Sequence, residues 1–108
     1  MSATGLITRY YAAFNAGDMD TFLGLLHEDV AHDINQGQRE VGHHAFERFM
    51  ERMNRCYREQ LSDIVVMAND DGTRAAAEFI VHGEYLASDE GLPAARGQRY
   101  VLRAGAFF

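Results

Sequence analysis

The stretch that decides the fold lies between residues 10 and 42 and contains two adjoining runs. The first reads YYAAFNAGD at residues 10–18, and the second reads HEDVAHD at residues 27–33. The first predicts the end of a helix, because glycine accepts the left-handed conformation of a helix C-cap. The second predicts the entry to a strand. This helix–turn–helix–strand order can place a phenol, Tyr10, and a carboxylate, Asp33, over one cavity.

Hydrophobic periodicity predicts helices early in the chain and strands late. Apolar residues recur at helical spacing in three segments and alternate with a period of two in most of the others. The predicted helices cover about residues 6–14, 19–26 and 43–59, and the predicted strands cover residues 29–34, 39–41, 61–68, 73–86 and 98–108. Such an order is typical of an α+β fold with an antiparallel sheet.

The composition indicates one acidic globular domain. A length of 108 residues allows a single domain, residues 1–108, and 47% apolar residues is typical of a globular chain. The net charge of −6, with no lysine, argues against nucleic acid or an anionic membrane as a partner. The sequence shows no secretory signal and no apolar run of about 18 residues. Because Cys56 is the one cysteine, no intrachain disulfide forms, and we expect a cytoplasmic protein.

The turn and the strand entry carry a resemblance to a known family. The run from Arg9 to Asp20 and the run His27-Glu28-Asp29-Val30 are similar to the start of the SnoaL-like and ketosteroid-isomerase-like family. Nuclear transport factor two shares the cone-shaped fold of that family. The resemblance implies a curved mixed β-sheet wrapped around three helices, a cystatin-like α+β barrel, and a homodimer formed through the outer face of the sheet. Family members usually add a turn and a strand after the point reached by Phe108, so either that strand is absent or the sequence is a fragment.

The resemblance also implies catalytic residues. In the isomerases a tyrosine of the first helix donates a hydrogen bond to the oxyanion, and a strand carboxylate moves the proton. Tyr10 matches the tyrosine, and Asp33 matches the carboxylate when residues are counted back from Gly42. Counting forward from Tyr10 puts Ile34 there instead. Because a slip of one residue turns a strand side chain to the opposite face, His32 takes the place of Asp33 in the other register.

The second acid of the isomerases has no match, since Gly105 stands at about its position. The chain departs less from the SnoaL-like polyketide cyclases, which use a single acid in a hydrophobic pocket. The leading hypothesis is therefore cofactor-free proton transfer on a small apolar carbonyl compound, as an isomerase or a cyclase performs it. The alternative hypothesis is a non-catalytic domain of the same fold that binds a small ligand or serves as an interaction module.

A set of aromatic and polar residues is predicted to line the cavity. Its members are Phe14, Phe22, Asn35, Phe46, Met50, Tyr57, His82, Tyr100 and Phe107. Turn formation is the simpler explanation for Asn35, and His82 lies on a mixed strand face with Glu84. Because no second histidine or aspartate stands at ligand spacing on a neighbouring strand, we predict no metal site and no cofactor. The loop over residues 87–97 is long enough to be a lid.

Overall fold

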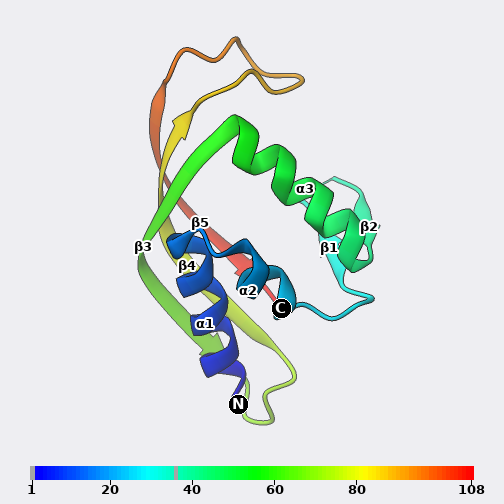
Figure 1. Ribbon diagram of the computed structural model, residues 1–108. Helices are drawn as coiled ribbons and strands as arrows, with labels where there is room; N and C mark the ends of the chain where they lie inside the picture. The colour runs from blue at the N-terminus through cyan, green and yellow to red at the C-terminus, as the bar shows by residue number, and fades with distance from the viewer. Residues whose placement is uncertain (1, 36) are drawn as a thin grey trace.

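The computed structural model describes residues 2–35 and 37–108 and has an α+β architecture, which confirms the predicted fold class (Figure 1). Helices early in the chain are followed by a curved antiparallel sheet. The helices are α1 (Ala3–Ala16), α2 (Met19–Gly24) and α3 (His43–Cys56), and the strands are β1 (Ala31–Asp33), β2 (Arg39–Val41), β3 (Tyr57–Ala68), β4 (Ala75–Tyr85) and β5 (Arg99–Phe107).

Local capping sets the ends of the first two helices. The Ser2 hydroxyl accepts a hydrogen bond from the backbone N–H of Gly5 and so caps α1. Gly17 ends α1 at a φ of 71°, a conformation that side chains disfavour. Asp18 then caps α2 by accepting from the N–H of Thr21. The NAGD turn therefore reverses the chain so that α2 packs beside α1.

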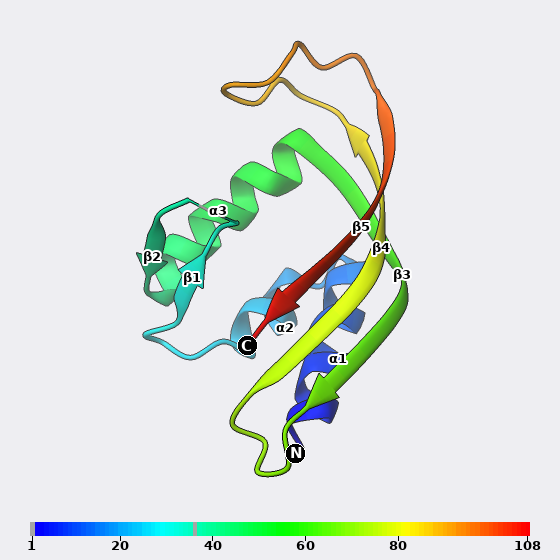
Figure 2. The same ribbon diagram turned by 180° about the vertical axis from the view of Figure 1, so that it is seen from behind.

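The strands form two separate antiparallel sheets. Strand β1 pairs with β2, and the larger sheet has the order β3-β4-β5. All strand pairs in the described residues are antiparallel, so the mixed pairing that was expected is corrected. The larger sheet curves around α1, while α3 runs from the β1–β2 hairpin back to the start of β3 (Figure 2). A bulge between Ser62 and Val65 interrupts the pairing of β3 with β4. Because bulges bend strands, it contributes to the curvature of the larger sheet.

The junction of α3 and β3 differs from the predicted one. The helix ends at Cys56 and the strand begins at once, so that Tyr57 has an extended backbone with a φ of −135°. Tyr57 pairs with Tyr85, and Glu59 pairs with Gly83. The prediction of helix as far as residue 59 is wrong, because pairing with β4 outweighs the helical pattern in these residues.

The core lies between α1, α2, α3 and the concave face of the sheet. Its buried side chains include Tyr10 and Tyr11 of α1, Phe22 of α2, Phe46 of α3 and Ala77 of β4. Strand β5 forms one edge of the larger sheet. Among the residues described, no helix has the length and apolar character needed to cross a membrane.

Candidate functional site

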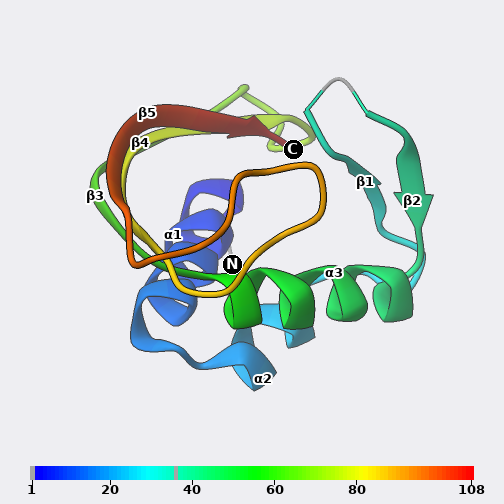
Figure 3. The same cartoon turned by 90° about the horizontal axis from the view of Figure 1, so that it is seen from above.

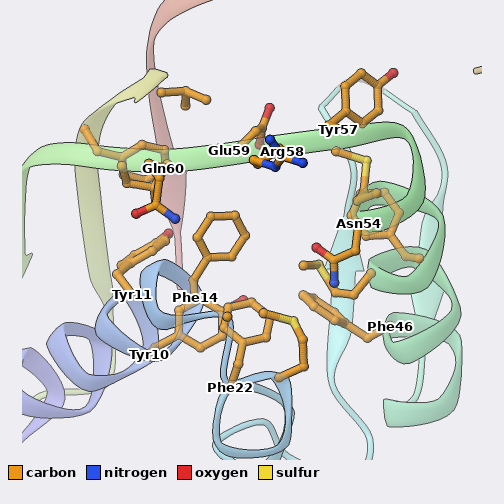
Figure 4. Close-up of a pocket in the computed structure, with 18 of the residues that line it drawn as sticks. Tyr10, Tyr11, Phe14, Phe22, Phe46, Asn54, Tyr57, Arg58, Glu59 and Gln60 are labelled. Atoms are coloured by element: carbon orange, nitrogen blue, oxygen red, sulfur yellow. The ribbon is translucent and has the colours of Figure 1, made fainter. Parts of the chain in front are cut away.

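A cavity of about 520 Å³ opens between the helices and the concave face of the sheet (Figure 4). All three helices and strands β1, β3 and β4 contribute to its wall. Most of the wall is aromatic: Tyr10, Tyr11, Phe14, Phe22, Phe46, Phe49, Tyr57 and Phe79. The polar residues in the wall include His32, Asn54, Arg58, Glu59 and Gln60. A wall of this kind suits a small, largely apolar molecule that carries few polar groups.

His32 is the imidazole in this cavity. Its ring lies 4.5 Å from the ring of Phe46 and 4.7 Å from that of Phe49, measured between ring centroids. Its Nδ1 is buried and has no hydrogen-bond partner in the described residues. Burial lowers the pKa of His32 below 6.5, although the nearby carboxylates of Glu40 and Asp33 act in the opposite direction. The imidazole is therefore mainly neutral at pH 7 and is able to accept a proton.

Asp33 lies outside the cavity, and its expected cavity-facing position is corrected. Its carboxylate accepts from Arg39 Nε at 2.7 Å and from a terminal guanidinium nitrogen of Arg39 at 2.8 Å. The side chain is 57% exposed, and the hydrogen bonds from Arg39 lower the pKa of Asp33. The reason is strand alternation: His32 faces the core, so its neighbour faces solvent and pairs with the residue opposite in β2.

Tyr10 contributes a phenol from α1. Its side chain is buried, and its ring stacks on Phe22 with centroids 4.1 Å apart. Its hydroxyl makes no hydrogen bond to any described residue. Burial, with a smaller contribution from Tyr11, raises the pKa of Tyr10 well above its usual value of 10.0. The phenol therefore keeps its proton and remains a hydrogen-bond donor.

The predicted ligand-binding residues divide into two groups. Phe14, Phe22, Phe46, Met50 and Tyr57 line the cavity.

Asn35, His82, Tyr100 and Phe107 do not line this cavity. Asn35 has a φ of 53° in the exposed turn between β1 and β2. His82 faces the outer side of the sheet, where its Nε2 lies 2.8 Å from the Ser62 hydroxyl. Phe107 is 90% exposed, because its neighbour Phe108 is the residue that turns toward Tyr10. Tyr100 lies on β5, outside the wall of this cavity. These four placements correct the expectation that all four residues line the cavity.

Sequence reasoning missed Glu59. Its position two residues after Tyr57 and two before Leu61 places all three on the concave face of β3. The alternation of Tyr57 and Leu61 was a signal for this placement, but a predicted helix over the same residues hid it. The Tyr100 hydroxyl, which comes from β5, donates to a carboxylate oxygen of Glu59.

The loop between β4 and β5 lies beside the C-terminal end of α3 and the start of β3 (Figure 3). Asp89 accepts hydrogen bonds from the Tyr57 hydroxyl at 2.7 Å and from Arg52 Nε at 2.8 Å. Burial, and then the bond to Asp89, raise the pKa of Tyr57 to about 12. In the described ranges, no group of three or more His, Cys, Asp or Glu side chains is arranged to hold a metal ion.

Comparisons place the chain among proteins of known structure. A family model described as the SnoaL-like domain matches residues 7–108. A Pseudomonas putida KT2440 protein, provisionally described as a polyketide cyclase, has 71% sequence identity and a TM-score of 0.98, and the match covers 100% of this chain and 81% of that chain. A Xanthomonas campestris protein with the same provisional description has 64% identity and a TM-score of 0.94, over 98% of this chain and 78% of that chain. No curated protein matches the chain.

A more distant likeness concerns the fold alone. A Kribbella flavida protein, provisionally described as a ketosteroid isomerase, has 21% identity and a TM-score of 0.57. That match covers 94% of this chain and 78% of that chain.

Proposed function

Since the chain belongs to the SnoaL-like domain family, we propose that it binds a small, largely apolar carbonyl compound and catalyses a proton transfer on it without a cofactor. The observation that carries this proposal is the neutral imidazole of His32, whose Nδ1 is buried without a partner among the described residues, in an aromatic cavity. A base kept neutral by burial is suited to remove a weakly acidic proton near neutral pH.

In the proposed reaction His32 and Tyr10 act on one carbonyl group. His32 removes a proton from the carbon next to the carbonyl, and the electron pair of that C–H bond moves to the carbonyl oxygen as an enolate. The Tyr10 hydroxyl donates a hydrogen bond to this oxygen and stabilises its charge, an effect that is strong in a site with little water. In an isomerase the enolate of a conjugated substrate takes the proton back from His32 at another carbon. In a cyclase the enolate carbon attacks a second carbonyl, and the alkoxide formed takes the proton back from His32.

The descriptions of the two similar bacterial proteins favour the cyclase type within this proposal. The isomerase type has less support, because Gly105 stands where the resemblance places the second acid. A Cβ atom at that position would approach the carbonyl oxygen of Ala77 to 2.9 Å, so β5 leaves little room there for a side chain.

The lack of a second acid beside Tyr10, in the part of the chain that the structure describes, favours a second candidate function. In the described residues no acid from β5 lines the cavity beside Tyr10, and such a cavity also suits a domain that only binds its ligand. The two candidates differ in one respect, which is whether a bound carbonyl compound exchanges the protons on the carbon next to its carbonyl.

Proton exchange tests the proposal directly. The ketone 2-tetralone is dissolved in D₂O with the protein, and loss of its α-proton signals is followed by NMR. We expect exchange well above that of buffer with the wild type and near the buffer rate with His32→Gln. The matched control His82→Gln, on the outer face of the sheet, is expected to exchange like the wild type. A ligand-induced rise in melting temperature with no exchange above buffer would instead support the binding-only domain.

A further inference from the structure

A second pocket adjoins the first beneath the loop between β4 and β5. It has a volume of about 400 Å³ and is walled by Tyr85, Leu92, Pro93 and Leu102, among others. Three residues line both pockets, namely Met53, Tyr57 and Glu59. Figure 4 shows Tyr57 and Glu59 at the end of the first cavity that lies away from Tyr10 and Phe22. The two pockets therefore meet at the beginning of β3.

Glu59 is held at this junction by a row of three residues across the sheet. Glu59 of β3 pairs with Gly83 of β4, and Gly83 pairs with Tyr100 of β5. The ring of Tyr100 lies over Gly83, in the space that any side chain at that position would fill. The glycine thus lets the phenol reach across β4, where its hydroxyl donates to the carboxylate of Glu59.

The hydrogen bonds at the junction leave one acceptor free for a ligand. Tyr100 donates to Oε2 of Glu59, and the Tyr57 hydroxyl is already engaged with Asp89. Oε1 of Glu59 has no hydrogen-bond partner among the described residues. An ionised carboxylate only accepts hydrogen bonds, so it attracts a hydroxyl or an amine and repels a carbonyl oxygen.

We propose that the two pockets form one bipartite ligand site with Glu59 at its centre. The ligand class is an elongated molecule with an apolar group in each pocket and a hydroxyl or amine between them, which donates to Oε1 of Glu59. Tyr100 and Gly83 are positioning residues that fix the carboxylate. This inference rests on the proposed function only in that the first pocket binds a small molecule, and it adds the shape and polarity of that molecule.

Two probes with the same arms and different centres test the proposal. Diphenylmethanol carries a hydroxyl between two phenyl rings, and benzophenone carries a carbonyl at the same place. Their affinities are measured by isothermal titration calorimetry with the full chain. Because hydrogen bonds to a charged group are strong, we expect the wild type to bind diphenylmethanol at least about tenfold more tightly than benzophenone. Glu59→Gln, whose amide can donate to a carbonyl, is expected to remove or reverse that preference.

Further variants test the hydrogen bond between Tyr100 and Glu59 and the second pocket one at a time. Tyr100→Phe and Gly83→Ala each retain the carboxylate of Glu59 but remove the hydrogen bond that fixes its position. Both are therefore expected to reduce the preference for diphenylmethanol. Leu102→Trp fills the second pocket and is expected to weaken both probes at least about tenfold. Arg103→Trp, next to it on the opposite face of β5, is the matched control and is expected to bind like the wild type. Circular dichroism establishes that each variant is folded.

Two results would overturn the proposal: an unchanged preference in Glu59→Gln, or unchanged affinities in Leu102→Trp. If Glu59→Gln fails to fold, Tyr100→Phe is the deciding variant. A preference for diphenylmethanol that does not change when the Tyr100 hydroxyl is lost would contradict the role proposed for the hydrogen bond from Tyr100 to Glu59. The exchange of 2-tetralone protons is measured on the same samples. If the wild type exchanges the protons and the variants keep the preference for diphenylmethanol, the bipartite site is wrong and the proposed function stands. If the wild type does not exchange the protons and the variants lose that preference, the proposed function is wrong and the bipartite site stands.

Discussion

At the scale of single residues, the decisive feature is which of two neighbours in β1 faces the core. His32 lies among Phe46 and Phe49, and Asp33 lies in solvent with Arg39. His32 is a neutral base in a mainly aromatic wall, and Asp33 is an ionised acid whose charge is balanced by Arg39. The chemistry proposed for the cavity therefore depends on an imidazole, and the carboxylate next to it serves the β1–β2 hairpin.

The lowered pKa of His32 makes stability depend on pH. Between 6.5 and the lower pKa of the folded state, the unfolded chain binds a proton at His32 that the folded chain resists. We expect the free energy of unfolding to rise with pH through this window and to fall on acidification. Urea unfolding at about pH 5.5 and pH 7.5 measures the difference, and His32→Gln should reduce it. Phe14→Leu, a packing control, should lose about 1 kcal/mol at both pH values; an equal pH dependence in wild type and His32→Gln would contradict the prediction.

Asp33→Asn is expected to leave the proton-exchange activity unchanged. The carboxylate lies outside the cavity and is mostly exposed, so its loss costs only a solvent-screened ion pair with Arg39. The measurement is the rate of 2-tetralone exchange, with the melting temperature taken alongside. A fall in exchange as large as that of His32→Gln would mean that Asp33 participates in the reaction.

At the scale of elements, the order of helices and strands was predictable, but the boundary between α3 and β3 and the register of β1 were not. Capping residues and apolar spacing predicted α1, α2, β2, β4 and β5 well, because these signals are local. The α3–β3 junction was misplaced by three residues, since pairing of residues 57–59 with β4 is a long-range interaction that periodicity does not report. That shift hid Glu59, and the one-residue ambiguity in β1 hid the orientation of His32 and Asp33.

The β4–β5 loop is expected to loosen when its tether is removed. Asp89 joins the loop to β3 through Tyr57 and to α3 through Arg52. Asp89→Ala removes both bonds and should raise amide hydrogen exchange in residues 87–97, while protection in α1 remains that of the wild type. Glu90→Ala, beside it in the same loop, is the control, because its side chain has no such role. Unaltered exchange in the loop of Asp89→Ala would show that other contacts hold it.

At the scale of the whole molecule, the sheet has two faces with different roles. The concave face packs on the helices and lines the cavity through Phe79 and Val81. The outer face carries polar side chains such as His82 together with exposed apolar ones. Strand pairing places Met67 and Phe107 beside Ala76, and Val101 beside His82, on this outer face.

This outer face is expected to join two copies of the chain. Met67, Val101 and Phe107 are 48%, 67% and 90% exposed at the two ends of this face, and exposed apolar side chains on one face mark surfaces that associate. We propose a homodimer through the sheet, measured as twice the 12.1 kDa chain mass by sedimentation equilibrium. Val101→Glu replaces an exposed apolar side chain of this face by a carboxylate and should shift the equilibrium toward the monomer, because burying an unpaired carboxylate is costly. Arg103→Glu, on the same face of β5, already stands at a charged position and should associate more strongly than Val101→Glu. If the wild type sediments as a monomer at high concentration, the proposed dimer is wrong and the proposed reaction needs only one chain.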